Sequence, residues 1–428
     1  MRRSFQIIVF LKSFATGVMA PVLALALLAH GASISTISLL LGAYSFTVIA
    51  AEFPSGVFAD LCGRKKAFLL STLLALLCYC LLLFSKTIPF LLCAMVIHGL
   101  SRAFSSGSID ALAIDDAVAN GGVLAKVTGQ LSILESAGLA AGALSGGFLS
   151  GLGALYEGNL IANLAIYALL FLLTVCCVHE QTHARAEQAE NGNGGFRRLG
   201  LHVKESLSFA AQKGMVRMLF VFSFITGFAL ISIETYWQPA LNALSPAPWL
   251  LGVVSFAGFF CVILGSKAIE RMLIKRPDGG TALLLGCKAL VGIWLMLLVS
   301  QFRTHFFIAA YMLAYLFLGG GSVAENTLLN QATPASQRAS ILSLFSFVLQ
   351  IGALFASLIG YVVSAQTNFR NMWLIAGALL LLGVAAFALV YVHQRRRAMS
   401  KKEPEPPVED KTEEVPVVQP CSTESIQP

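Results

Sequence analysis

Long apolar segments separated by short polar ones recur along the whole chain. The first six cover about residues 5–29, 34–58, 67–85, 88–110, 127–151 and 158–178. After a polar stretch at about 179–214, six more follow at about 216–241, 249–267, 280–300, 305–327, 339–363 and 370–392. A helix needs about 20 predominantly apolar residues to cross the hydrocarbon core of a bilayer. The pattern therefore predicts an all-α membrane protein with twelve transmembrane helices.

The composition agrees with this pattern. Of the 428 residues, 57% are hydrophobic and only 12% are charged, which is far from the balance of a water-soluble domain. Most of the nine cysteines lie in the apolar segments, and none has a histidine at zinc-ligand spacing. We interpret these cysteines as small packing residues and expect neither a disulfide framework nor a metal site.

The polar stretch in the middle divides the chain into two halves of six spans. We predict an N-terminal six-helix bundle at 1–178, a cytoplasmic linker at 179–214, a C-terminal six-helix bundle at 215–393 and a disordered cytoplasmic tail at 394–428, which is rich in proline and glutamate. The halves also correspond weakly to each other: Asp115 and Asp116 precede Lys126, much as Asn330 and Gln331 precede Arg338.

Lysine and arginine concentrate on the cytoplasmic side of membrane proteins. With both termini in the cytoplasm, 23 of the 29 lysines and arginines fall in cytoplasmic segments. The net charge of +7 then reports orientation, and we expect no nucleic-acid partner. A cleaved signal peptide is the alternative for the N-terminus, but an apolar run of about 25 residues is long for a signal core. The chain is predicted in the plasma (bacterial inner) membrane.

One polar motif lies where the second apolar segment gives way to the third. Its members are two glycines, one carboxylate and two cations: Gly56, Asp60, Gly63, Arg64 and Lys65. In type and spacing it resembles the signature loop between spans two and three of the major facilitator superfamily. An ordinary positive-inside hairpin would explain its basic residues but not the spacing of its glycines and aspartate.

The resemblance covers about residues 1–395. It implies two pseudo-symmetric six-helix bundles with a substrate site between them near the midplane. It also implies that the motif latches the cytoplasmic gate, with Asp60 accepting hydrogen bonds or pairing with basic residues. The family usually has a basic residue after the aspartate, whereas this chain has Leu61. The latch is then expected to be weaker or to depend on Arg64 and Lys65.

A second, partial resemblance lies in the fifth apolar segment. Gly129, Gly138 and Gly142 resemble the glycine-rich motif of drug:proton antiporters, although Leu139 and Ala143 replace its usual proline and glycine. Small residues at spacing four also allow close helix packing. Both interpretations, an antiporter signature and helix-packing glycines, stay open at this stage.

Charged residues inside spans are candidates for function because each is costly in hydrocarbon unless it is paired or hydrated. At 1.5 Å per residue, Glu135 and Arg102 lie at similar depths, about 13 Å or more from the cytoplasmic edge. We hypothesise that Glu135 carries a proton whose binding depends on Arg102 and on the side to which the cavity opens. A static ion pair between the two residues is the alternative.

Three further polar residues lie in spans. Lys12 either faces the cavity and binds an anionic group or, as we slightly favour, extends to the membrane interface. His98 is one helical turn before Arg102 and titrates near physiological pH, although such a histidine is more often simply hydrogen-bonded. Lys288 is expected to extend to the interface.

Four other candidates lie toward the ends of their spans. Asp110 and Glu52 are near cytoplasmic ends, where contacts of a gate are more expected than contacts to substrate. Glu234 and Trp237 are near the outer end of the seventh span. They are predicted to form an external vestibule or, for the aromatic residue, an interfacial anchor.

The chain has neither a phosphate-binding Gly-rich loop ending in Gly-Lys-Ser/Thr nor a nucleophile elbow. We therefore expect no enzyme activity, no cofactor and no ATP hydrolysis of its own. The predicted function is secondary transport by alternating access, namely proton-coupled export of small amphipathic or drug-like compounds. The alternatives are a proton- or cation-coupled symporter or a uniporter of a nutrient or metabolite, and, from another class, a transporter-like receptor or scaffold. The expected partners are a small-molecule substrate, protons and the lipid bilayer, with no obligate protein partner.

Overall fold

The computed structural model of the chain describes residues 1–428 except 107, 122, 179–211, 245–246, 335–336 and 401–428. The side chains at 60, 124–125, 277, 339–340 and 392–400 also lie outside the description. Within the described residues every regular element is a helix. Residues Met1–Ala386 form one compact unit, and Phe387–Pro428 are assigned to a second.

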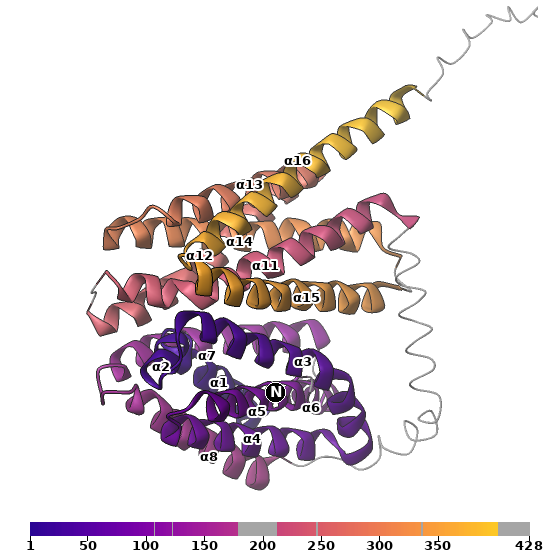
Figure 1. Cartoon of the computed structure of the whole chain (residues 1–428). Helices are drawn as coiled ribbons and strands as arrows, with labels where there is room; N and C mark the ends of the chain where they lie inside the picture. The colour runs from indigo at the N-terminus through magenta and orange to yellow at the C-terminus, as the bar shows by residue number, and fades with distance from the viewer. Residues whose placement is uncertain (107, 122, 179–211, 245–246, 335–336, 401–428) are drawn as a thin grey trace, which may run out of the picture. The chain divides into compact units, whose positions relative to one another are not determined.

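Eight helices make up the described part of the first half. They are α1 (Arg3–Met19), α2 (Leu23–Ala29), α3 (Ile34–Cys62), α4 (Arg64–Phe84), α5 (Ile88–Ser105), α6 (Ile109–Ala119), α7 (Leu124–Leu149) and α8 (Glu157–Cys177). In Figure 1 they run from indigo to magenta and gather as one group.

The second half contains six long helices and one short 3-10 turn. They are α11 (Gly214–Asn242), α12 (Pro248–Lys275), η3 (Pro277–Gly279), α13 (Gly280–Leu298), α14 (Thr304–Ala332), α15 (Arg338–Gln366) and α16 (Asn371–Ser400). The predicted linker lies outside the described residues except at 212–214. The predicted disordered tail does so except at 394–400, where α16 continues as a helix, so the tail begins later than predicted.

The described helices account for the predicted twelve spans. Eleven are long and apolar enough to cross a membrane on their own, and the bent pair α1 and α2 supplies the twelfth if it is one span. The all-α membrane fold and its span count are thereby confirmed.

The first span is broken where the sequence places a proline. α1 ends at Met19, α2 begins at Leu23, and the two axes differ by 50°. Pro21 has no N–H, and its ring clashes with the carbonyl group one turn earlier, so a kink or break in the helix is favoured at this point. The break frees backbone groups inside the membrane, and these need partners elsewhere.

The fourth span is also interrupted, between Ser105 and Ile109. Ile88–Ala119 nevertheless counts as one candidate span, so the predicted run at 88–110 is one span that extends to Ala119. Asp110 lies in the first turn of α6.

The polar motif is mostly helical rather than a loop. α3 continues through Pro54 to Cys62, and α4 starts at Arg64, so Gly63 alone makes the turn. Its φ of 103° is a conformation that favours glycine. Gly56 is helical, and a Cβ added there would meet no atom within 4 Å, so Gly56 has no part in the turn.

The two halves repeat the same helix pairing. In the first half α1 packs on α7, α3 on α5 and α4 on α5; in the second, α11 packs on α15, α12 on α14 and α13 on α14. Counted as spans, these are pairs 1–5, 2–4 and 3–4 repeated as 7–11, 8–10 and 9–10. Between the halves α3 packs on α15, which are spans 2 and 11, and α7 packs on α12, which are spans 5 and 8. Replacing each span by its counterpart in the other half converts one of these contacts into the other.

Glycines bring α1 and α7 close together. A Cβ at Gly142 would collide with the Phe14 carbonyl oxygen, and one at Gly138 with the Phe10 carbonyl oxygen. The equivalent pair α11 and α15 has the same device, because a Cβ at Gly227 would meet the Leu349 carbonyl oxygen. Small residues therefore set the helix spacing at corresponding interfaces of both halves.

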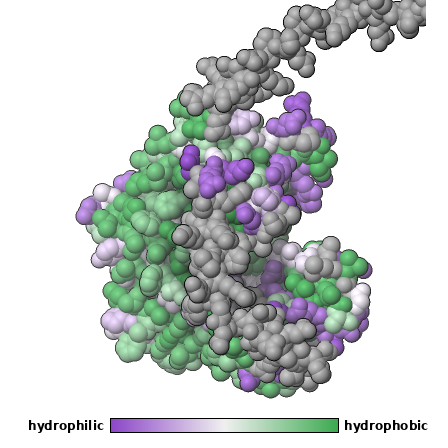
Figure 2. Space-filling view, turned by 90° about the vertical axis from the view of Figure 1, so that its right-hand side faces the viewer, coloured by the Kyte–Doolittle hydropathy of each residue, from purple (hydrophilic) through white to green (hydrophobic). Residues whose placement is uncertain are grey.

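Large apolar side chains cover much of the outer surface. Examples are Phe84, Phe302 and Ile133, which are 78%, 73% and 69% exposed. Figure 2 shows hydrophobic (green) residues over a broad part of the visible face, with hydrophilic (purple) residues gathered in patches. Such extensive apolar exposure is typical of a surface in contact with lipid.

Candidate functional site

The most concentrated group of charges is formed by Lys12, Asp110 and Glu135. Lys12 Nζ donates to both carboxylate oxygens of Asp110, at 2.8 and 2.7 Å, and lies 3.3 Å from Glu135 Oε1. The lysine side chain is 12% exposed, and the Asp110 and Glu135 side chains are 28% and 42% exposed. One cation therefore serves two carboxylates, and the three together carry a net charge of −1 when all are ionised.

Helix packing places these three side chains. The glycine contacts hold α1 against α7, which brings Lys12 opposite Glu135, and α6 packs on both of these helices. Asp110, in the first turn of α6, contacts the same lysine. The prediction that Lys12 extends to the interface is thus wrong, and the predicted gate residue Asp110 belongs to this cluster.

The predicted pair of Arg102 and Glu135 does not form. Glu135 has its ionic contact with Lys12, and among the described residues Arg102 has no hydrogen bond or ion pair through its side chain. Its guanidinium is nevertheless within electrostatic range of Tyr44, His98 and Tyr167. Equal depth in the membrane placed the two charges at one level but did not establish that they face each other.

A cavity of about 500 Å³ is lined by Lys12, Arg102 and Glu135 among others. Side chains of α1, α2, α3, α4, α5, α7 and α8 line it from the first half, and α11 contributes from the second. The polar and aromatic ones among them are Lys12, Ser13, Thr16, Tyr44, Phe68, Ser71, Tyr79, His98, Ser101, Arg102, Ser105, Glu135, Ser136, Tyr167, Glu234 and Gln238. A volume of this size is within the range of pockets that hold small organic molecules.

One wall of the cavity is aromatic. The rings of Tyr44 and His98 have centroids 5.1 Å apart, Tyr79 lies 5.9 Å from His98, and Tyr79 stacks on Tyr167 at 5.6 Å. Among the described residues none of the three tyrosine hydroxyls has a hydrogen-bond partner, and His98 Nδ1 is buried without one. Donors and acceptors are therefore unused at this wall.

The second half reaches the cavity through α11. Glu234 lines it and accepts a very short hydrogen bond from the Tyr315 hydroxyl of α14. Glu234 was predicted in an external vestibule, and the structure places it at the cavity instead. Trp237 is 1% exposed and packs against Tyr311 at 5.1 Å between ring centroids. The prediction of an interfacial aromatic anchor is therefore wrong for Trp237.

We call the end of the helices that carries Arg2 and Arg64 the basic end, and the other the opposite end. At the opposite end Gln238 of α11 bridges the break between α1 and α2. Its Nε2 donates to Ala20 O at 2.8 Å, and its Oε1 accepts from Ala24 N at 2.9 Å. The amide thus satisfies backbone groups freed by the Pro21 break and ties the two halves together.

Two other contacts join the halves near the opposite end. The Tyr236 hydroxyl lies 2.6 Å from Ser38 Oγ of α3 and accepts from Ser364 Oγ of α15 at 3.1 Å. Gly147 of α7 lies so close to Gly252 of α12 that a Cβ on either glycine would approach the partner's backbone within 3 Å. Contacts between the halves therefore hold them together at the opposite end.

The motif residues at the basic end contact other helices of the first half. Arg64 Nη1 donates to Asp115 Oδ2 at 2.5 Å, and Lys65 Nζ donates to Val175 O at 3.0 Å. Arg2 adds an ion pair with Asp116 at 3.0 Å. The Asp60 side chain lies outside the described part, so its predicted role as a latch stays a prediction.

Glu52 and Gly129 stand apart from the cluster. Glu52 is exposed, does not line the cavity, and among the described residues its side chain has no hydrogen bond or ion pair. Gly129 has no atom within 4 Å of an added Cβ, so the helix-packing interpretation is wrong for this glycine, unlike Gly138 and Gly142.

A second buried ion pair, which the sequence reasoning missed, lies inside the second half. Lys288 Nζ of α13 lies 2.6 Å from Glu325 Oε2 of α14 and 2.5 Å from Thr226 Oγ1 of α11. Both charged side chains are 5% exposed, and Glu325 Oε1 is buried without a partner among the described residues. Lys288 therefore does not extend to the interface. Lys288 and Glu325 are 37 residues apart in the sequence, so no local sequence pattern reveals this pair.

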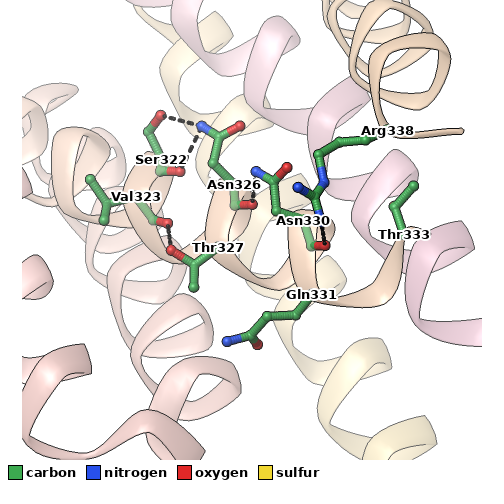
Figure 3. Close-up of a pocket in the computed structure, with 8 residues that line it drawn as sticks. All are labelled: Ser322, Val323, Asn326, Thr327, Asn330, Gln331, Thr333 and Arg338. Atoms are coloured by element: carbon green, nitrogen blue, oxygen red, sulfur yellow. Dashed lines mark hydrogen bonds between the residues drawn. The ribbon is translucent and has the colours of Figure 1, made fainter. Parts of the chain in front are cut away.

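A polar groove follows α14 at the basic end. It has a volume of about 660 Å³ and is drawn in Figure 3. Ser322, Asn326 and Asn330 follow each other at a spacing of four, and each asparagine amide donates to the backbone one turn earlier, at 3.0 and 2.8 Å. Arg338 reaches Asn330 O at 3.5 Å. The hydrogen-bond donors of both asparagine amides are therefore satisfied within their own helix.

Known proteins resemble this chain along almost its whole length. A family profile described as Major Facilitator Superfamily matches residues 6–299 and 249–423. The uncharacterized MFS-type transporter YxaM of Bacillus subtilis (strain 168) is 26% identical over 390 residues, which are 89% of this chain and 93% of that protein.

Solved structures show the same fold. The nucleoside transporter NupG matches with a TM-score of 0.77 and 15% identity over 91% of this chain and 98% of the other. A POT family transporter in complex with 5-aminolevulinic acid matches with a TM-score of 0.67 and 12% identity over 90% and 95%. The family profile covers more than half of the sequence, so the chain belongs to the Major Facilitator Superfamily and is a multi-pass membrane transporter of that type.

Proposed function

We propose that the chain is a proton-coupled secondary transporter of a small polar solute, working by alternating access through the 500 Å³ cavity. The observation that carries this proposal is the cluster of Lys12, Asp110 and Glu135, in which Lys12 and Glu135 line the cavity. The basic end is assigned to the cytoplasm by the distribution of lysine and arginine. We place the protein in the plasma (bacterial inner) membrane with both termini inside.

The cluster supplies a reason for proton coupling. Lys12 holds Asp110 at 2.7 Å but Glu135 at 3.3 Å, and Glu135 is the more exposed of the two carboxylates. When Glu135 takes up one proton, its bond to Lys12 weakens, and Lys12 and Asp110 remain as a neutral pair. The cluster then carries no net charge, which lowers the cost of moving it through a closed, low-dielectric intermediate. Deprotonation on the other side restores the net negative charge.

The lining of the cavity favours a polar solute over a lipophilic drug. Four charged side chains and three tyrosine hydroxyls face it, and an apolar compound would leave these groups desolvated. Export of drug-like compounds was supported by the glycine resemblance in α7, but Gly138 and Gly142 have packing roles that explain their identity. A metabolite or nutrient substrate is therefore the proposal that we favour. The receptor alternative rested on the tail, which lies outside the described residues.

Replacing Glu135 by glutamine is expected to abolish proton movement while leaving solute exchange. In proteoliposomes that contain a pH dye, the wild-type protein should couple proton flux to the addition of a substrate found by screening nucleosides, amino acids, organic acids, sugars and lipophilic cations. E135Q should lower this flux at least about tenfold, because the amide binds no proton, and should retain counterflow of labelled substrate.

Glu157, an exposed glutamate at the start of α8, provides the matched control. E157Q should behave as the wild type in both assays. Unchanged proton flux in E135Q would remove Glu135 from the mechanism. The direction of the flux decides between the open alternatives, because a symporter carries protons with the solute and an exporter carries them against it.

Replacing Gln238 by leucine is expected to open the cavity toward the opposite end. Leucine fills similar space but loses both hydrogen bonds to the α1–α2 break, each worth about 1 kcal/mol. Losing both, about 2 kcal/mol, shifts the equilibrium between cavity orientations by about 30-fold. The measurement is labelling by a membrane-impermeant maleimide, added outside, of a cysteine introduced at Leu23, which lines the cavity.

Gln301, which lies between α13 and α14 at the same end, is the control position. Q301L should leave labelling of the Leu23→Cys site unchanged, and the protein without the introduced cysteine gives the background. Equal labelling in Q238L and the parent would show that the amide bridge does not bias the conformational equilibrium.

A further inference from the structure

Arg102 lines the cavity and has no counterion among the described residues. Arg102 is exposed to the cavity from the middle of the fourth span, and among the described residues its side chain has neither an ion pair nor a hydrogen bond. An arginine inside a membrane span is costly unless water or an anion compensates its charge. Because the fold keeps the guanidinium unpaired despite this cost, we infer that the guanidinium has a role.

The other charged groups at the cavity are already engaged. Lys12 is held by two carboxylates, one of which is Glu135. Glu234, on the α11 side, accepts the hydrogen bond of Tyr315. Arg102 is therefore the charge at this cavity that the described protein atoms leave without a partner.

The surroundings of Arg102 are rich in donors. The hydroxyls of Tyr44, Tyr79 and Tyr167 have no hydrogen-bond partner among the described residues, and none of the three oxygens is among the buried unpaired atoms, so they stay available to a ligand in the cavity. A guanidinium beside several hydroxyl donors is suited to an acidic group, which accepts but does not donate when it is ionised.

The same wall offers flat apolar surface. The rings of Tyr44, Tyr79, His98 and Tyr167 form a connected chain with centroid separations between 5.1 and 5.9 Å. Aromatic rings in such a wall favour a planar ligand that packs at offset or edge-to-face geometry. Arg102 can therefore bind the acidic group of a ligand while the adjacent aromatic side chains pack against its ring.

We propose that Arg102 and the tyrosines around it form the binding site for the acidic group of an aromatic organic anion, which is the transported solute. The proposal rests on the proposed function in that it takes this cavity as the substrate site. It does not depend on proton coupling through Glu135, since binding at equilibrium requires no gradient.

The test is thermal unfolding of the full chain in detergent with ligands that differ only in charge. The acids are phenylacetate, indole-3-acetate and phenylphosphonate; the controls are phenylacetamide, indole-3-acetamide, phenethylamine and tryptamine. Ligands that bind the folded state raise the unfolding temperature in proportion to their affinity. We expect the acids to stabilise the protein and the amides and amines not to do so, and the comparison of the carboxylates with the phosphonate identifies the preferred acid.

Arg102→Gln should weaken binding of the stabilising acid by about 10- to 100-fold, the range for losing charged hydrogen bonds. Arg102→Lys should recover part of it, because the ammonium keeps the charge but lacks the planar fork. Arg303→Gln, which removes an exposed arginine outside the cavity, is the matched control and should bind as the wild type.

Three outcomes would overturn the proposal: no acid stabilises the protein, the amides or amines stabilise it equally, or Arg102→Gln binds the acid unchanged. Glu135→Gln separates this proposal from the proposed function. If it binds the acid normally but still moves protons, the coupling mechanism fails and the anion site stands. If it loses acid binding while Arg102→Gln retains it, the anion site fails.

Discussion

Replacing Gly142 by leucine is expected to prevent stable assembly of the first bundle. A Cβ at this position would collide with the Phe14 carbonyl oxygen and lie 2.9 Å from Gly17 Cα, so the obstruction is backbone that has no alternative rotamer. Overpacking by single methylenes costs about 1–3 kcal/mol, and a whole side chain pressed against backbone costs more. We expect a lower yield of monodisperse protein and a fall in unfolding temperature of more than 10 °C, or about 3 kcal/mol or more.

Gly129→Leu is the matched control, on the same helix and with the same change of residue. An added Cβ there meets no atom within 4 Å. Leucine has the higher helix propensity, so this variant should be neutral or more stable by up to about 1 kcal/mol. Size-exclusion profiles and thermal unfolding in detergent compare the two. Equal behaviour of Gly142→Leu and Gly129→Leu would contradict the packing role of the glycine contacts between α1 and α7.

The spans and their grouping could be predicted from the sequence because the bilayer imposes a simple rule. Every segment of about 20 apolar residues must form a helix that satisfies its own backbone. The breaks in these helices were harder to predict. Pro21 is visible in the sequence and marks the break in the first span, but the interruption between Ser105 and Ile109 has no proline to announce it.

The charged cluster could not be predicted because depth in the membrane does not determine direction around a helix. Lys12, Arg102 and Glu135 were identified as charges within spans, and their levels were estimated from the rise per residue. The predicted pairing of Arg102 with Glu135 was wrong. Close packing of α1 on α7 brings Glu135 next to Lys12, and α6 places Asp110 against the same lysine. Which charges meet is settled by glycine-mediated spacing and by a helix break, both of which are tertiary features.

The two ionic clusters differ in access. In the first, Lys12 and Glu135 line the cavity and Glu135 is 42% exposed, whereas Lys288 and Glu325 are each 5% exposed and do not line it. A proton and a solute can reach the first cluster without unfolding the bundle. The second holds three helices of the second half together through Thr226 and is expected to serve stability.

Replacing Lys288 by methionine is expected to destabilise the second bundle strongly. Methionine fills a similar volume but leaves Glu325 as a buried carboxylate without its cation, and breaking a buried pair in this way costs about 3–5 kcal/mol. The double variant K288M/E325M should recover most of that loss, because a pair of apolar side chains of similar volume is often as stable as the ion pair. Unfolding free energies of the two single variants and the double variant in detergent micelles give the coupling between the residues.

An exposed ion pair of the same chain supplies the comparison. Lys267 and Glu270 lie 2.9 Å apart on α12 with side chains 62% and 48% exposed. Solvent screens such a pair, so K267M should change the unfolding free energy by less than about 1 kcal/mol. If K288M were equally mild, the carboxylate of Glu325 would be reaching water or a proton in the variant. If the double variant were as unstable as the sum of the single ones, the coupling energy would be zero, and a structural role of the ion pair would be contradicted.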